Sequence, residues 1–364
     1  MSHFNMLDGE LDAELQSSVE NLMSRVCEYS RLIAMYDGDR SVATELWDKI
    51  RFELGLAGML IPEEMGGVGL TAREAAVVTQ TLGRSMAATP FLTSSVVATS
   101  LLLSANSALI AQMASGELTV AVALPFSTAP MGNLSTFSID ADGLIVGSAR
   151  SVAGAIEAQT LIVPVLNNDG IALYAVDADS LTVMPRVSLD MTRQVADVTC
   201  QRVRGTLVAQ NAEQMLRRAL LIGAVLLASE QVGVARWCLD TSVAYLKERR
   251  QFGQPLGNFQ ALKHRLADLY VGVENARAAA RFAAVSLAEG DPDVEIATAV
   301  AQAFCSDVAV LAAEEAVQLH AGMGMTWEHP AHLYLKRAKA DQVAFGSAGE
   351  FRARLADLVD LRFP

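Results

Sequence analysis

The first and last parts of the chain have the hydrophobic pattern of helices. Apolar residues recur at the spacing of one helix face through Leu15–Met35 and Val42–Leu54. From about Asn211 onward, long stretches rich in Ala and Leu follow one another: Ala212–Arg250, Gln260–Glu289 and Ile296–His320. Helical stretches of this length predict a bundle.

The pattern changes near Thr119. From there to about Val208 the chain contains short β-branched runs separated by Gly, Asn and Asp: Thr119–Leu124, Leu144–Val146, Thr160–Val165, Ile171–Ala175, Leu181–Met184 and Val195–Val203. Such runs predict a small antiparallel β domain or barrel. We therefore expect a mainly α fold with a central β domain: an N-terminal helical domain over 1–118, a β-barrel-like domain over 119–208 and a C-terminal helix bundle over 209–364.

One turn inside the N-terminal part has a clear local signature. The segment Ile61–Leu70, IPEEMGGVGL, combines Pro with three glycines between two helical stretches. Thr71 follows as a plausible N-cap, and Glu74 lies three residues later, which is the spacing of a capping box. We expect a turn over 61–70 and a new helix from Thr71.

Composition and charge narrow the function classes. The 364 residues are 52% hydrophobic, enough for a large core, and the net charge of -13 argues against a nucleic-acid partner. No apolar run reaches the roughly 20 residues of a membrane span, and the N-terminus lacks the pattern of a signal peptide. The four cysteines have no CxxC spacing, which argues against a metal site: Cys27, Cys200, Cys238 and Cys305. We expect a soluble, cytoplasmic protein with reduced thiols.

The segment Lys247–Gln260, KERRQFGQPLGNFQ, contains the most informative chemistry. The Arg249 guanidinium can pair with a pyrophosphate, the Phe252 ring can cover an apolar ring face, and the Gln260 amide can donate and accept. The segment resembles the ERxxFGxxxxxFQ signature of the acyl-CoA dehydrogenases, and the resemblance implies their fold, with a middle antiparallel β domain and a C-terminal four-helix bundle. In that family the segment reaches across a subunit interface to the FAD of a neighbouring chain. The resemblance implies FAD contacts from these three residues and from Gln251.

A second segment, Gln318–His332 (QLHAGMGMTWEHPAH), resembles the family's Q-x-x-G-G-x-G stretch along the adenosine and pyrophosphate of FAD. Gln318 and Gly322 match this pattern, whereas Ala321 replaces the first glycine of the pair. His320 lies inside the motif. It is either a structural hydrogen-bonding group near a helix end or a contact to phosphate.

The positions of the catalytic base depart from the family pattern. The base removes the α-proton of the acyl thioester, so it must be a carboxylate close to the substrate. In most members a glutamate starts an E-G-T/S step after a basic run, and Phe345-Gly346-Ser347 aligns with this step. Other members place the base 29 residues before the signature phenylalanine, where this chain has Gly223. A phenyl ring and a glycine cannot accept the proton.

Three other carboxylates are candidates for a relocated base. Glu230 lies two turns beyond Gly223, about 10 Å along a helix, and we expect it on a helix surface or at an interface. Asp341 and Glu350 flank Phe345 in sequence, and we expect both to be solvated surface charges.

The strand that would hold the flavin ring is also altered. Catalytic members have a strand ending in T-E-P-x-A-G-S-D. The equivalent stretch here, TVAVALPFSTAP, retains only Pro125, and Leu124 stands at the position of the acid. The half-site for the ring is therefore degraded, whereas the half-site that reaches a neighbour's FAD is retained.

Three hypotheses follow from this asymmetry. The resemblance favours the non-catalytic subunit of an actinobacterial, α2β2-type heteromeric acyl-CoA dehydrogenase. The implied partners are a paralogous subunit that supplies the base, an acyl-CoA substrate and an electron-transfer flavoprotein as acceptor. The alternatives are a self-sufficient homo-oligomeric enzyme with a relocated base and a flavin-free scaffold protein. The retained Arg249 and Gln260 argue against the scaffold, because the fold alone does not need them.

Overall fold

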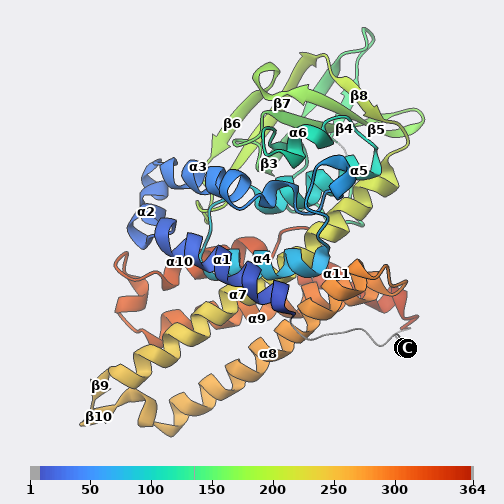
Figure 1. Cartoon of the computed structure of the whole chain (residues 1–364). Helices are drawn as coiled ribbons and strands as arrows, with labels where there is room; N and C mark the ends of the chain where they lie inside the picture. The colour runs from blue at the N-terminus through green and yellow to red at the C-terminus, as the bar shows by residue number, and fades with distance from the viewer. Residues whose placement is uncertain (1–8, 135, 362–364) are drawn as a thin grey trace.

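The N-terminal region is helical, as expected. The computed structural model describes residues 9–134 and 136–361 (Figure 1). Its N-terminal helices are α1 (Glu10–Val26), α2 (Tyr29–Ala34), α3 (Ser41–Asp48), α4 (Ala72–Arg84), α5 (Thr99–Ser104) and α6 (Ile110–Ala114). Two π-helical stretches, Lys49–Glu53 and Leu92–Ala98, extend α3 and precede α5. The helix expected over Leu15–Met35 is interrupted at Cys27 and Glu28, where α1 ends and α2 begins.

The predicted start of α4 is confirmed. Thr71 Oγ1 accepts a hydrogen bond from the Arg73 N–H at 3.2 Å, and a Glu74 carboxylate oxygen accepts one from the Thr71 N–H at 2.8 Å. The Thr71 side chain also faces the Glu74 N–H, which completes the capping box between Thr71 and Glu74. In the preceding turn Gly66 and Gly69 adopt φ of 87° and 71°, a backbone region that glycine enters without steric cost.

The β region forms one mixed sheet. Its strands are β1 (Val120–Val122), β2 (Phe137–Ile139), β3 (Ile145–Ala153), β4 (Thr160–Asn167), β5 (Gly170–Asp177), β6 (Thr182–Arg186), β7 (Val195–Val203) and β8 (Thr206–Ala209). The order is β6-β7-β3-β2-β4-β5-β8, with β1 also beside β4. Both β1 and β2 run parallel to β4, and the other pairs are antiparallel. The expected antiparallel β domain is present, and the two parallel pairs with β4 were not foreseen, because strand periodicity does not reveal pairing partners.

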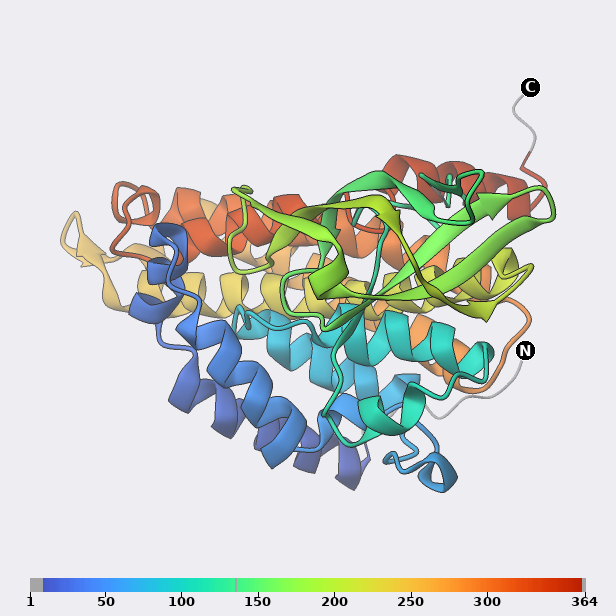
Figure 2. The same ribbon diagram turned by 90° about the horizontal axis from the view of Figure 1, so that it is seen from above.

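The bundle contains α7 (Glu213–Glu248), α8 (Gln260–Ala288), α9 (Val294–Leu319), α10 (Ala331–Asp341) and α11 (Ala348–Leu358). A small hairpin, β9 (Arg250–Gln251) and β10 (Gln254–Pro255), joins α7 to α8 and projects from the end of the molecule away from the large sheet (Figures 1 and 2). By length and composition α7 and α9 could cross a membrane, but 83% and 72% of their most apolar windows are buried inside the protein, as in core helices.

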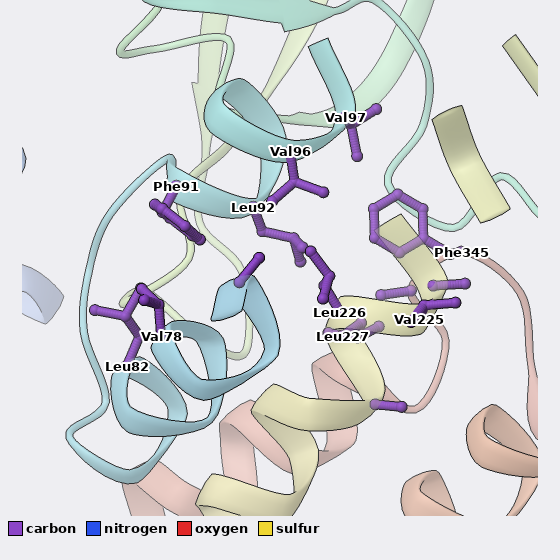
Figure 3. Close-up of a cluster of buried hydrophobic side chains, with 14 of the residues drawn as sticks. Val78, Leu82, Phe91, Leu92, Val96, Val97, Val225, Leu226, Leu227 and Phe345 are labelled. Carbon is purple, nitrogen blue, oxygen red and sulfur yellow. The ribbon is translucent and has the colours of Figure 1, made fainter. Parts of the chain in front are cut away.

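One apolar core unites the N-terminal helices with the bundle, and a second lies within the sheet. Helices α4 and α7 approach closely at Gly233, where a Cβ atom would lie 1.9 Å from the Gln80 carbonyl oxygen. Glycine is therefore required for this approach. The same core packs the Leu92–Ala98 stretch onto α7 (Figure 3). This packing brings Gly223 beneath Val97 and beside Phe345.

Candidate functional site

The hairpin after α7 presents its signature residues to solvent. The Arg249 backbone ends the helix, donating its N–H to the Tyr245 carbonyl at 2.8 Å, and its side chain is exposed. Phe252 stands at the turn with φ 52° and is 86% exposed; its ring is perpendicular to that of Phe259, with centroids 6.1 Å apart. Gln251 in β9 and Gln260 at the start of α8 are also exposed. An aromatic ring this exposed indicates a surface that a ligand or partner covers.

The glycine segment lies at the same end of the bundle. Gln318 is exposed in the last turn of α9, and Gly322 is exposed with no atom within 4 Å of the position of a Cβ. Tyr245 of α7, two residues before the first segment, stacks on His320 at the end of α9, with centroids 4.5 Å apart. The structure therefore brings together the FAD-contacting positions expected from the two motifs.

His320 is placed differently from the other expected contacts. Its ring is buried, and its Nδ1 forms a 2.7 Å hydrogen bond with the Ala316 carbonyl oxygen. Burial lowers the pKa of the ring, which favours the neutral form. Of the two expectations for His320, the geometry matches the structural hydrogen-bonding group. Ala321, which replaces the family glycine, follows with φ 51°. Its backbone is therefore in the left-handed region, which alanine adopts less readily than glycine.

Phe345 and Gly223, the two positions that the family resemblance assigns to the base, meet in space. Phe345 is 4% exposed, and a Cβ atom on Gly223 would lie 2.9 Å from its Cζ. The Phe345 ring meets the edge of Phe126 at a centroid distance of 5.1 Å, and its N–H donates to the Phe126 carbonyl at 2.9 Å. Figure 3 shows Phe345 among the apolar side chains of α7 and of the stretch that contains Val97. The volume opposite Gly223 is filled by a phenyl ring, and neither position supplies a carboxylate.

A buried ionic cluster lies next to this apolar contact. Arg337 of α10 donates to Asp190, to Glu230 at 2.6 Å and to the Thr192 hydroxyl at 2.6 Å. Burial disfavours the charge of Arg337, but Asp190 and Glu230 outweigh it and hold the pKa of the guanidinium above its ordinary value. The same arginine holds the pKa of Asp190 below the usual range despite its burial. The cluster ties the β6–β7 loop to α7 and α10.

Arg193 extends the cluster toward the filled base position. It donates to Glu230, lies 3.6 Å from Asp341, and places its guanidinium 5.0 Å from the centre of the Phe126 ring. Glu230 and Asp341 are both buried, so the expectation that they lie on the surface was wrong. The guanidiniums of Arg193 and Arg337 compensate the buried charge of Glu230. The burial of Glu230 could have been predicted from the sequence, because this residue lies inside the mainly apolar run LLASEQVGV.

None of the three candidate carboxylates, Glu230, Asp341 and Glu350, is arranged to act as a catalytic base. Glu230 accepts hydrogen bonds from two guanidiniums. Burial and the neighbouring Glu230 raise the pKa of Asp341 to about 8, so its carboxyl is protonated at neutral pH. Glu350 is exposed and accepts the Ser347 N–H at 2.8 Å as the capping-box residue of α11.

The protonation of Asp341 predicts a pH dependence of stability. In the unfolded chain this carboxyl titrates near 3.8, whereas in the folded protein it titrates at about 8. Folded protein therefore retains a proton that the unfolded chain loses, and the free energy of unfolding falls as the pH rises from about 4 to about 8. Asp341→Asn should flatten this decline in urea unfolding at about pH 5, 7 and 8.5. Burial also raises the pKa of Glu157 to about 7, so both proteins should contain Glu157→Gln. If the free energy of unfolding fell equally with pH in the proteins with and without Asp341→Asn, the raised pKa of Asp341 would be contradicted.

A pocket of about 510 Å³ is lined by residues of α7, α9 and α11. Its lining includes Leu221, two residues before Gly223, and Phe351, whose ring is 3.4 Å from the position of a Cβ on Gly346. Three arginines and one glutamate line it: Arg217, Arg218, Arg354 and Glu295. Arg354 pairs with Glu295 at 2.7 Å, and Arg217 pairs with Glu213 at 2.7 Å. Arg217 is fixed by a hydrogen bond to the Pro130 carbonyl at 2.6 Å. Guanidiniums around a partly apolar pocket suit a ligand with phosphate groups.

Comparisons with known proteins agree with this geometry. Residues 10–117 match the acyl-CoA dehydrogenase N-terminal domain, and residues 213–357 match the acyl-CoA dehydrogenase C-terminal domain. Acyl-CoA dehydrogenase IpdE2 of Mycolicibacterium smegmatis is 31% identical over 94% of this chain and 96% of that protein. A solved variant of the Tcur3481-Tcur3483 steroid ACAD is 28% identical, with a TM-score of 0.85 over 97% of this chain and 98% of that one. The ChsE4-ChsE5 complex of Mycobacterium tuberculosis shares the fold, with 24% identity and a TM-score of 0.86 over 99% and 100% of the two chains. The chain therefore belongs to the acyl-CoA dehydrogenase family of FAD-dependent oxidoreductases.

Proposed function

We propose that this chain is the non-catalytic subunit of a heteromeric acyl-CoA dehydrogenase. In this assembly it contributes half of an FAD site to a paralogous subunit that supplies the base and the pocket for the flavin ring. The observation that carries the proposal is the contrast between two regions of one chain. Arg249, Phe252 and Gln260 are exposed at the end of the bundle, whereas Phe345 fills the position of the base.

The retained residues suit the polar part of FAD. The Arg249 guanidinium would neutralise the pyrophosphate through paired hydrogen bonds. Phe252 would cover an apolar face of the cofactor, and the amides of Gln251, Gln260 and Gln318 would donate to or accept from its polar groups. Gly322 permits close approach of the backbone, since no neighbouring atom occupies its side-chain volume. Bound FAD would accept a hydride from the β-carbon of the acyl substrate, and the partner's base would take the proton from the α-carbon.

The comparisons support two parts of the proposal. The name of the 28% identical solved relative, the Tcur3481-Tcur3483 steroid ACAD, joins two proteins, which supports a heteromer. The word steroid in that name supports a bulky acyl-CoA substrate such as a steroid side chain. The arginine-lined pocket would hold the phosphates of such a thioester. We further place the assembly in the cytoplasm, as an α2β2 heterotetramer with an electron-transfer flavoprotein as its acceptor, as the family resemblance implies.

Flavin stoichiometry tests the proposal. Co-expression with a paralogous dehydrogenase subunit should give a yellow complex that contains about half a flavin per polypeptide, because each heterodimer then has one complete FAD site. This chain expressed alone should not dehydrogenate acyl-CoA. A homotetramer with one flavin per chain and full activity would overturn the proposal.

The self-sufficient alternative needs a carboxylate that can act as a base. Among the described residues, Glu230 is held by Arg193 and Arg337, and Asp341 is protonated at neutral pH. Substituting Glu230, Asp341 and Glu350 singly in a purified homo-oligomer would identify a relocated base, since one change would abolish turnover while flavin stays bound. The scaffold alternative requires that Arg249→Ala and Gln260→Ala leave the flavin content of the complex unchanged.

A further inference from the structure

The Lys336 ammonium lies between two aromatic rings. Its Nζ is 4.2 Å from the centre of the Tyr36 ring and 4.1 Å from the centre of the Trp327 ring. The two rings meet edge to face, with centroids 5.4 Å apart. A cation held against two ring faces is attracted by both π systems. Three elements distant in sequence are thereby joined: the turn after α2, the segment between α9 and α10, and α10.

Hydrogen bonds anchor both rings to the rest of the protein. Tyr29 at the start of α2 donates its hydroxyl to the Trp327 carbonyl at 2.6 Å. The Tyr36 hydroxyl donates to the Leu189 carbonyl and accepts from the Met191 N–H, each at 3.4 Å. Leu189 and Met191 flank Asp190, which pairs with Arg337 in the buried ionic cluster. The rings are therefore connected to the N-terminal helices and to the β6–β7 loop.

The segment held in this way contains Gly322. Between α9 and α10 the regular structure consists of one short 3-10 turn, Met323–Met325, and Met325 is 78% exposed. The inner end of the segment is fixed by the stack of His320 on Tyr245. The outer end is fixed at Trp327, which is itself 56% exposed. Contacts at Trp327 thus limit the conformations available to the glycine backbone.

We propose that Lys336, Tyr36 and Trp327 form a clamp that fixes the glycine segment in the conformation that contacts a partner's FAD. These are positioning residues, because they act through the backbone around Gly322 rather than on the cofactor. The inference rests on the proposed function for its link to FAD, whereas the clamp itself belongs to this chain alone. Its loss should weaken FAD binding, since the segment must then be ordered when FAD binds.

Three variants test the clamp. Lys336→Met removes the charge and keeps the length of the side chain, and Lys336→Arg keeps the cation. Lys339→Met is the matched control, because Lys339 lies on the same helix and makes only an exposed ion pair with Glu314. In the co-expressed complex, Lys336→Met should raise the Kd for FAD about tenfold, Lys336→Arg should restore most of the affinity, and Lys339→Met should leave it unchanged.

A second measurement uses the isolated chain and needs no partner. Of the three tryptophans, Trp47 is buried and Trp237 is half-buried, so quenching of fluorescence by acrylamide reports mainly on Trp327. Lys336→Met should increase quenching and Lys339→Met should not. Unchanged quenching in Lys336→Met would overturn the clamp. Increased quenching with unchanged FAD affinity would overturn its positioning role. A wild-type complex without FAD would overturn the proposed function, and the quenching result would still decide whether the clamp exists.

Discussion

Arg249→Ala is expected to lower the affinity of the heteromeric complex for FAD by about 100-fold, equivalent to about 2.7 kcal/mol. The side chain is exposed at the end of α7 and is free to turn toward a ligand. A guanidinium that makes paired, charge-assisted hydrogen bonds to a pyrophosphate has no substitute in alanine. The Kd would be measured by titrating the deflavinated complex with FAD and following flavin fluorescence.

Arg250→Ala is the matched control for this experiment. Arg250 is the next residue, is equally exposed and has the same charge, but it lies in β9 opposite Pro255 and outside the motif positions. It should change the affinity by less than about threefold, the scale of a general electrostatic effect. The fold should be unaffected by either change, because Arg249 ends α7 through its backbone N–H. Equal losses from the two variants would show that only net charge matters and would remove Arg249 from the FAD site.

Arg337→Met is expected to reduce the free energy of unfolding by about 3–5 kcal/mol. The guanidinium is buried and pairs with Asp190 and Glu230, which are also buried. Methionine fills similar volume but leaves the two carboxylates with less compensating charge, and each must then either remain ionised in a poor environment or take up a proton. Urea unfolding at neutral pH measures the difference.

Two comparisons separate this cause from a general loss of packing. Lys339→Met, on the same helix, breaks only an exposed ion pair and should cost about 0–1 kcal/mol. Combining Arg337→Met with Asp190→Asn and Glu230→Gln should recover part of the lost stability, because the penalty arises from unpaired carboxylates. A triple variant no more stable than Arg337→Met would indicate that packing, and not charge, dominates.

The helices and most strands could be predicted because their signals are local. The predicted helix Gln260–Glu289 differs from α8 by one residue, and the capping box at Thr71 depends on residues three positions apart. Strand partners have no such local signal. β1 and β2 pair in parallel with β4 across long connections, so alternation within each strand could not reveal the mixed sheet.

The candidate site also has one part that could be predicted from local sequence and one part that could not. Arg249, Phe252 and Gln260 lie within twelve residues, and their spacing could be recognised directly. The ionic cluster combines residues 190–193 with Glu230, Arg337 and Asp341. Each of these charges would be on the surface in an isolated helix or loop. Their burial depends on partners that the chain brings together only when it folds.

The sequence by itself determined the family, the helix–sheet–bundle order, the motif at Arg249, Phe252 and Gln260, and the loss of a carboxylate at Phe345 and Gly223, because these depend on residue identity and short spacing. Only the tertiary structure decided that the Phe345 ring fills the volume beside Gly223, that Glu230 and Asp341 are buried, and that Lys336 lies between Tyr36 and Trp327. These are contacts between distant segments, and their energies depend on packing and desolvation that no single segment has before the chain folds.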